Sequence, residues 1–494
     1  MQRMSIAWTR ILPAHFRGRG LEKLNEHLRN TTLEPLHIHA LLPWPANHVY
    51  GESFNDVASM LHKHVHRLKS LHIRAVTPEL IGPFLKHTLF STNHRVVASL
   101  EELDVAVKLD SDDQRLNDHR PQMASVLQDA GETLPSLKSL TLPGYHECIP
   151  IPTSSSVFTN LTQLRVNGTG LGNGSPLYNL LRFLHHTPNL EFLFYKTPDQ
   201  FSYQLGRTPP EGSWTIGKKD IPVSIPVSLP RLCVGDVSAS GSGTDLLRNI
   251  SAPNLEHVHM DGSRNQDRLE DWHIGLIDDV GDVLAEISRR SPDIRSITLT
   301  EMPLEERVFK WLLGGEPFVY TEMPPEEPTI KQLLRKLQGT AAVKPTTSMP
   351  HFRKLEELIV RDMEMTKDQA EDLSVNDRKG EWKVELTDGA LAQYASNADS
   401  VTLKKLGIHR AKRLSPDVIL AVGRKGVRDL AQHGVTTPFV MEFMQNQGPP
   451  TECLDELGKI GVKVEWTEEA EGSDTDRRGW WTNDFKIDDC YYLN

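Results

Sequence analysis

The sequence predicts an α/β solenoid, with a curved parallel sheet on its concave side and helices on its convex side. Three observations predict this fold class. An apolar residue followed by others three and five positions later recurs along the chain, a proline often stands two residues before the first of them, and helix-like apolar spacing precedes several copies. Five copies carry the proline, namely the four clear ones at Pro135, Pro188, Pro253 and Pro292 and a less certain one at Pro230.

The strand of each unit is predicted from the last two apolar residues, which alternate as side chains on one face of a sheet do. The first apolar residue lies on the bend that leads into the strand. A proline just upstream cannot continue a helix and biases the residue before it toward extended structure. Each unit is therefore expected to run from a helix through a bend into a strand.

Eleven copies of this pattern follow one another between residues 33 and 408. In order they are Leu33/Leu36/Ile38, Leu68/Leu71/Ile73, Leu100/Leu103/Val105, Leu137/Leu140/Leu142, Leu161/Leu164/Val166, Leu190/Leu193/Tyr195, Leu232/Gly235/Val237, Leu255/Val258/Met260, Ile294/Ile297/Leu299, Leu355/Leu358/Val360 and Leu403/Leu406/Ile408. The seventh copy also fits Leu229/Leu232/Val234, and we prefer the register that keeps Pro230 two residues ahead of the first apolar residue.

Such units repeat in one chain direction, so they predict a parallel sheet with right-handed crossovers. A single unit cannot bury its own apolar face, and stacking of neighbours is required. The intervals between copies are mostly longer and less even than the roughly 20–29 residues of regular leucine-rich repeats. The expected architecture is therefore an irregular leucine-rich-repeat-like solenoid.

Four regions are predicted along the chain. Residues 1–30 form an N-terminal cap, and residues 31–410 form the solenoid, with an irregular insertion at about 303–350 that contains a protruding loop, "GGEPFVYTEMPPEEPT", and a helix, "IKQLLRKL". Residues 411–466 form a C-terminal α/β cap, whose first helix begins after Ser415 with Pro416 in its first turn. Residues 467–494 form an acidic tail with 8 acidic and 3 basic residues, which is expected to be mobile.

Composition narrows the functional classes. The chain has 494 residues, of which 38% are hydrophobic and 24% charged, and a net charge of −11, which argues against a nucleic-acid partner. We see neither a signal peptide nor a membrane-spanning stretch, and we expect a monomer in the cytoplasm, the nucleus or both. The four cysteines lie far apart without a zinc-binding spacing, so reduced thiols are expected.

Motifs for catalysis, nucleotide binding and metal binding are missing from the sequence. We find no GxSxG, P-loop, GxGxxG or HExxH pattern. Ser240 to Thr244, "SGSGT", is interpreted as a turn because no lysine follows it, and the histidines of "HKHVH" (His62, His64 and His66) as a solvated helix end. We therefore predict a protein without enzymatic activity, cofactor or metal ion.

A candidate binding site follows from the strand pattern, because the residues that flank the buried positions point outward and form rows across neighbouring strands. Two phenylalanines, Phe192 and Phe194, stand side by side on one strand of this outward face. Exposed aromatic residues beside cations are typical of protein-binding hot spots. The predicted partner-binding residues on the concave face are Arg165, Phe192, Phe194, Lys196, His257 and His259. The alternative is that a loop or the acidic tail covers the two rings.

The phrase "LPxLxxLxL", the irregular spacing and a "PLxIxA" opening resemble the leucine-rich-repeat-like region of fungal F-box proteins of mushroom-forming fungi. In those proteins the F-box ends in a segment similar to "LWTRI", and here "AWTRILP" at residues 7–13 precedes "EPLHIHA" at residues 34–40. The resemblance implies the substrate-recognition region of an F-box protein in a cullin-RING (SCF-type) ubiquitin ligase.

The helical hairpin that docks on the ligase adaptor has no counterpart before Trp8. We therefore expect the adaptor to be a partner only if an F-box lies upstream, and otherwise expect one or more unidentified protein partners. Two alternatives stay open. One is a stand-alone leucine-rich-repeat scaffold or inhibitor without a ligase role, and the other is an enzyme whose catalytic residues are dispersed.

Overall fold

The computed structural model describes residues 7–11, 19–31, 34–42, 51–75, 80–90, 96–107, 126–128, 130–143, 148–152, 157–167, 177–196, 227–238, 241–262, 275–300, 304–315, 318–321, 346–349, 352–361, 382–383, 387–397, 401–409, 411–445 and 447–467. These residues fold into two compact units. Unit 1 comprises the described residues up to Pro253, and unit 2 comprises those of Asn254–Glu469. Each unit is described by itself.

Unit 1 is a parallel sheet whose strands follow one another in chain order. The strands are β1 (Ala7–Ile11), β2 (Leu36–Leu42), β3 (Leu68–Ala75), β4 (Glu102–Val107), β5 (Ser139–Pro143), β6 (Gln163–Asn167), β7 (Phe192–Lys196) and β9 (Val234–Ser238). The helical segments between them are α1 (Arg19–Asn30), α2 (Gly51–Lys63), η2 (Val65–Arg67), α3 (Ile81–Leu89), α5 (Ala130–Thr133) and α6 (Leu177–Leu184), and α7 (Gly241–Arg248) follows β9. A short pair, β8 (Val227–Ser228) and β10 (Ile250–Ser251), is also parallel.

Unit 2 has the same plan. Its parallel strands are β11 (His257–Asp261), β12 (Ser296–Thr300), β16 (Glu357–Arg361), β18 (Lys405–Ile408), β19 (Val440–Met444) and β20 (Lys463–Thr467). Its helices are α8 (Gly275–Arg290), α9 (Glu306–Leu312), α12 (Asp388–Ser396), η7 (Ala411–Arg413), α13 (Pro416–Gln432) and α14 (Thr451–Lys459). Two antiparallel ribbons accompany them, β13 (Leu304–Glu305) with β17 (Trp382–Lys383) and β14 (Phe318–Thr321) with β15 (Thr346–Met349).

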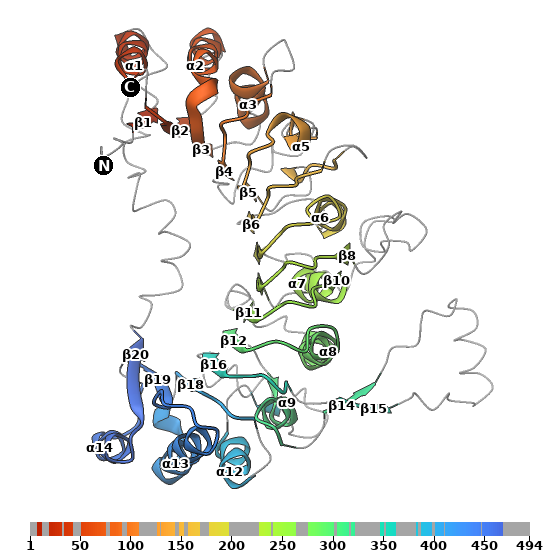
Figure 1. Ribbon diagram of the computed structural model, residues 1–494, viewed down its shortest axis with the longest axis vertical. Helices are drawn as coiled ribbons and strands as arrows, with labels where there is room; N and C mark the ends of the chain where they lie inside the picture. Colours follow the sequence, from red (N-terminus) through yellow and green to blue (C-terminus); the bar gives the residue numbers. More distant parts are fainter. Residues whose placement is uncertain are drawn as a thin grey trace, which may run out of the picture. The chain divides into compact units, whose positions relative to one another are not determined.

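The helices of each unit lie on one side of its sheet. Within each unit in Figure 1 the strands follow the inner side of a curve and the helices follow its outer side. The predicted fold class is therefore confirmed as an α/β fold with a parallel sheet of the leucine-rich-repeat-like type, because strands in chain order alternate with helices on one face.

The repeated apolar pattern accounts for the strands. Each of the eleven copies coincides with one strand, from β2 to β9 in unit 1 and from β11 to β18 in unit 2. Leu190, Leu193 and Tyr195 are fully buried, as the pattern requires. In β9, Gly235 pairs with Leu193 and Val237 pairs with Tyr195, so the preferred register of the seventh copy is confirmed.

A backbone ladder explains why the first apolar residue is followed by a bend. The carbonyl oxygen of the next residue accepts two N–H groups from the following repeat: Glu101 O accepts from Lys138 N (2.8 Å) and Ser139 N (3.1 Å). Lys138 O in turn accepts from Thr162 N (2.9 Å) and Gln163 N (3.0 Å). The bend therefore satisfies backbone groups that would otherwise be orphaned at the entrance to each strand.

The short strands β8, β10, β13, β14, β15 and β17 were not predicted, and β14 lies in the segment that was expected to be a protruding loop. Two strands of the parallel sheets, β1 and β19, were not predicted either, and each departs from the apolar pattern at one position. In β1 the register aligns Thr9 with Ile38, so a threonine stands where the third apolar residue is expected. In β19 Pro438 stands where the first apolar residue is expected. Both strands nevertheless pair in parallel with their neighbours, Thr9 opposite Ile38 and Met441 opposite Leu406. Tertiary pairing thus outweighs the local signal.

The structure also tests two predictions made for local segments. The helix after Ser415 is confirmed as α13, although the Ser415 side chain makes no capping hydrogen bond and its N–H donates to Asp388 Oδ1 at 3.0 Å. The turn interpretation of Ser240 to Thr244 was wrong, because α7 begins at Gly241. The helix predicted at residues 330–337 and the acidic tail beyond Thr467 lie outside the described residues.

Candidate protein-binding face

The strand face is the surface formed by strand side chains that point away from the helices. In unit 1 the strand register places one residue of each strand in a central row, which runs through His39, His72, Asp104, Thr141, Arg165, Phe194 and Asp236. Adjacent strands of a sheet lie about 4.8 Å apart, so neighbours in this row are in contact range. The row is mixed in character, with an ionic part and an aromatic part.

The ionic part of the row satisfies its own charges. The rings of His39 and His72 stack with centroids 4.4 Å apart and planes 2° apart. His72 Nδ1 lies 3.0 Å from Asp104 Oδ2, and Arg74 Nη2 donates to the same oxygen at 2.7 Å. Burial of Asp104 would raise its pKa, but the contacts with His72 and Arg74 outweigh burial and hold the pKa below its ordinary value.

The aromatic part of the row is built by β6 and β7. The guanidinium carbon of Arg165 lies 4.8 Å from the ring centroid of Phe192 and 5.6 Å from that of Phe194. Both rings are half-buried. We call Arg165, Phe192 and Phe194 the aromatic–arginine cluster. Stacking of a guanidinium on aromatic faces is favourable and fixes the position of the charge.

Lys196 differs from its sequence-based description. It was expected to flank the rings as a surface cation, but only 6% of the residue is exposed. Its Nζ lies 5.0 Å from the Phe194 centroid and 3.4 Å from Asp236 Oδ1. Lys196 is therefore a buried cation that contacts the Phe194 ring. Its charge is balanced by Asp236 on the neighbouring strand β9.

The predicted residues thus fall into two groups. Arg165, Phe192, Phe194 and Lys196 lie together on β6 and β7 of unit 1. His257 and His259 lie on the strand face of unit 2, on β11, where His257 is exposed and His259 Nε2 lies 3.0 Å from Thr300 Oγ1. The two phenylalanines are half-buried rather than fully exposed because Arg165 lies over both rings.

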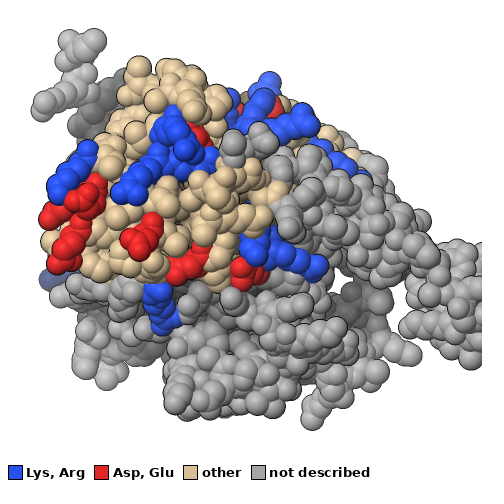
Figure 2. Space-filling view, turned by 90° about the horizontal axis from the view of Figure 1, so that it is seen from below, with Lys and Arg blue, Asp and Glu red and all other residues tan. Residues whose placement is uncertain are grey.

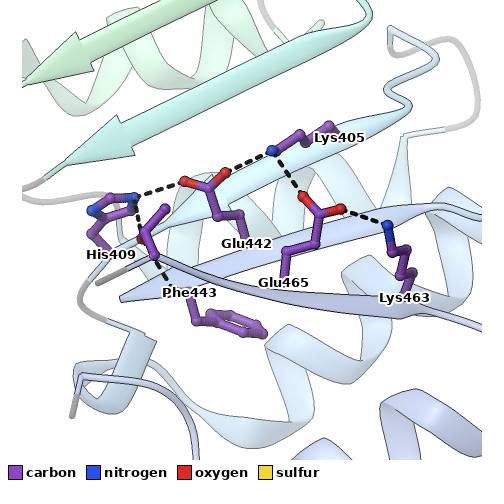
Figure 3. Close-up of polar contacts among 7 residues, drawn as sticks. Lys405, His409, Glu442, Phe443, Lys463 and Glu465 are labelled. Atoms are coloured by element: carbon purple, nitrogen blue, oxygen red, sulfur yellow. Dashed lines mark hydrogen bonds and ion pairs between the residues drawn. The ribbon is translucent and has the colours of Figure 1, made fainter. Parts of the chain in front are cut away.

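The strand face of unit 2 carries a polar network that the sequence analysis missed (Figure 3). Lys405 Nζ donates to Glu442 Oε2 at 2.6 Å and to Glu465 Oε2 at 3.0 Å. Lys463 Nζ reaches the other oxygen of Glu465 at 2.7 Å, and His409 Nε2 lies 3.0 Å from Glu442 Oε1. We call these five residues the Glu442 network. Four of them lie on β18, β19 and β20, and His409 directly follows β18. The alternation that places Phe192 and Phe194 on the outward face also applies to the last copy, Leu403/Leu406/Ile408, where it would have found Lys405 and His409.

Electrostatics explain how Glu442, which is nearly buried, keeps its charge in the Glu442 network. The contact with His409, and after it the contact with Lys405, lowers the pKa of Glu442 to about 2 although burial opposes the shift. Burial lowers the pKa of Lys405, but its two carboxylate partners outweigh burial and raise the pKa above its ordinary value. Both groups are therefore charged at neutral pH.

The Glu442 network lacks the geometry of a nucleophilic relay. Thr467 Oγ1 lies 3.3 Å from His409 Nε2, which is the same ring nitrogen that contacts Glu442, and it donates to Phe443 O at 3.3 Å. A hydroxyl is activated by a histidine whose second nitrogen is oriented by the carboxylate. With both groups on one nitrogen, this arrangement is an ion-pair network rather than a proton relay.

The surface of unit 2 around α14 carries charges of both signs. Figure 2 shows the face seen from below the view of Figure 1, and on the described part of this face Lys and Arg side chains lie beside Asp and Glu side chains. On α14, Lys459 Nζ lies 2.6 Å from Glu456 Oε1, with both side chains exposed. Exposed pairs of this kind contribute little to binding or stability, so we do not place the binding site here.

No model of a known protein family matches the sequence, and no curated protein matches it either. Within the part of the chain that the structure describes, no helix has the length and apolar content needed to cross a lipid bilayer. The same residues contain no group of three or more His, Cys, Asp or Glu side chains placed to hold a metal ion.

Proposed function

We propose that this chain is a protein-interaction module that binds its partner on the strand face of the solenoid. The observation that carries the proposal is the aromatic–arginine cluster. Two half-buried rings and a guanidinium on neighbouring strands give a rigid apolar surface with a directional charge. Aromatic and arginine side chains dominate the binding energy of protein interfaces.

The architecture supports the same proposal. A parallel sheet presents one or two outward side chains per strand, and these lie side by side across the sheet. An extended partner segment that crosses several strands contacts each in turn, so its contacts add up along the solenoid. Lys196, which lies beside the cluster, is paired with Asp236 within the sheet, so the cluster offers a partner the two rings and the charge of Arg165.

The finer proposal concerns the biological setting. By its resemblance to fungal F-box proteins, the chain is the substrate-recognition region of an F-box protein of a cullin-RING (SCF-type) ubiquitin ligase. The segments that carry the resemblance are β1, from "AWTRILP", and β2, from "EPLHIHA", which are adjacent parallel strands. The alternative is a stand-alone leucine-rich-repeat scaffold or inhibitor. In either setting we propose a binding protein rather than an enzyme, because the polar groups of the Glu442 network are engaged with one another.

Affinity purification of the tagged full chain, followed by quantitative mass spectrometry, tests the proposal. We expect Phe192→Ala/Phe194→Ala to lose the partners that the unchanged chain retains. The matched control is Val96→Ala/Val157→Ala, which removes two exposed apolar residues, 56% and 37% exposed, from the bends of unit 1 rather than from the strand face. Partners retained equally by both double variants would contradict the proposed face.

The same purification separates the two settings. A cullin and its adaptor among the bound proteins, together with a second protein that is lost in Phe192→Ala/Phe194→Ala, would support the ligase setting. A partner that depends on the two phenylalanines and binds without a cullin would support the scaffold or inhibitor.

A further inference from the structure

The charges on the strand face of unit 1 are largely paired within the sheet. Arg74 is engaged by Asp104 at 2.7 Å, and Lys196 lies 3.4 Å from Asp236. At the entrance to the strands, Glu101 accepts from Lys69 at 2.6 Å and from Lys138 at 2.7 Å. Arg74 and Lys196 are thus each balanced by one carboxylate, whereas Lys69 and Lys138 share the carboxylate of Glu101.

Arg165 is different. Its described contacts are the two aromatic rings, and among the residues that the structure describes it has no carboxylate partner. Thr141 and Phe194 are its neighbours in the central row, and neither carries a charge. Arg165 is only half-buried, so its charge stays accessible to a ligand that approaches the strand face.

The position of Arg165 over the two rings also determines how a ligand can approach. When the guanidinium plane lies over aromatic rings, its N–H groups remain available at the edge of the plane. That edge matches two coplanar oxygens, as in a carboxylate. Gln163 is exposed, pairs in register with Phe192, and offers an amide that can hydrogen-bond a peptide backbone.

We propose that the aromatic–arginine cluster recognises an acidic, extended segment of a partner protein. A carboxylate side chain of the segment takes the free edge of Arg165, and a neighbouring aliphatic or aromatic side chain packs on Phe192 and Phe194. This inference rests on the proposed protein-binding function and specifies its ligand. A carboxylate fits better than a phosphate, because Lys196, the other cation beside the Phe194 ring, is buried and paired with Asp236.

The test is selection of displayed random short peptides on the purified full chain. We expect the selected peptides to carry Asp or Glu within two positions of an aliphatic or aromatic residue. Arg165→Gln should weaken binding of a selected peptide about tenfold or more, as expected for loss of a hydrogen bond between charged groups. Arg165→Glu should reverse the preference and select Lys or Arg in place of the acid. Arg231→Glu, at an exposed arginine on the bend before β9, is the matched control and should leave the selection unchanged.

Thermal unfolding of each variant, followed by circular dichroism, establishes that it is folded. Arg165→Gln keeps the inference falsifiable if Arg165→Glu does not fold, because it removes the charge and leaves a side chain of similar length. Unchanged acidic preference in folded Arg165→Gln or Arg165→Glu would overturn the inference while leaving the proposed function intact. Failure of the unchanged chain to select any peptide, together with partners that ignore Phe192→Ala/Phe194→Ala, would overturn both.

The acidic segment 468–494 of the chain itself is the competing source of a carboxylate. A chain that ends at Thr467 separates the two sources. If a partner protein is the ligand, peptide affinity should be the same for the full and the shortened chain. A clear gain of affinity on shortening, abolished by Arg165→Gln, would assign the site to the chain's own tail and overturn the assignment to a partner.

Discussion

Glu442 is nearly buried and yet ionised, because its contacts with His409 and Lys405 hold its pKa at about 2. The folded-state pKa is lower than that of a carboxyl in the unfolded chain, so the charged group stabilises the fold above the unfolded pKa of roughly 4.3. This stabilisation is lost as pH falls through the folded value. The ionisation of Glu442 therefore makes the stability of the fold depend on pH.

We predict that Glu442→Gln lowers the free energy of unfolding at pH 7 by about 2 kcal/mol, a value below the full shift because the network shares its charges. The difference from the unchanged chain should shrink below about pH 4 and nearly vanish near pH 2. Urea unfolding at several pH values measures it. Glu456→Gln, which removes an exposed pair on α14, is the control and should have little effect at any pH. A difference that is the same at pH 3 and pH 7 would refute the assignment.

A second residue-scale feature is the close approach of Ile359 to Gly407. A Cβ on Gly407 would lie 2.8 Å from Ile359 Cγ2, so β16 and β18 pack more closely here than a larger residue permits. Glycine is required for this contact rather than for a turn.

We therefore expect Gly407→Ala to destabilise unit 2 by about 1 to 3 kcal/mol, the usual cost of overpacking. Ile359→Ala in the same chain should restore part of that loss, because it removes the side chain that the new methyl group meets. A double-mutant cycle by denaturant unfolding measures the coupling. Additive effects of the two changes would show that the contact is not the cause.

At the scale of elements, α13 and α14 show how the same substitution can act in opposite directions. Gly426 in α13 faces the Phe439 ring, where an added Cβ would lie 2.5 Å from ring carbons. Gly458 in α14 has no atom within 4 Å of the corresponding position. Glycine in a helix costs roughly 0.5–1 kcal/mol relative to alanine where nothing else intervenes.

We predict that Gly458→Ala raises the melting temperature of unit 2 slightly, in line with helix propensity. Gly426→Ala should lower it, because Phe439 is buried and its ring lies where the new methyl group would be. Differential scanning calorimetry of the two variants measures both effects. A rise in melting temperature for Gly426→Ala would show that helix propensity, and not packing, controls this position.

The elements also show what could be predicted from the sequence. Strands such as β7 were predicted because Leu193 and Tyr195 occupy buried positions that demand apolar residues, and burial leaves a regular trace in the sequence. β1 and β19 were missed because Thr9 and Pro438 interrupt that trace and neighbouring strands supply the missing information. The outward positions of β6 and β7 were predicted correctly from alternation, but burial of Lys196 was not. That burial depends on Asp236 in another strand, and no local pattern records which partner a lysine finds.

At the scale of the whole molecule, each repeat of a solenoid contacts only its neighbours, and stability spreads along the sheet through nearest-neighbour contacts. Leu193 is a test of this statement, because it is fully buried in β7 with β6 on one side and β9 on the other. Damage at Leu193 should therefore reach the adjacent repeats first.

We predict that Leu193→Asp destabilises unit 1 by several kcal/mol, because it buries a charge in an apolar row. Hydrogen exchange followed by mass spectrometry should show loss of protection in β6, β7 and β9, with a smaller effect on β2 and β3 at the far end of the strand order. Gln163→Asp is the matched control, since it places the same charge on the exposed strand face of β6. Unchanged protection in β6 and β9, with loss confined to β7, would mean that the repeats fold independently of one another and that the nearest-neighbour account is wrong.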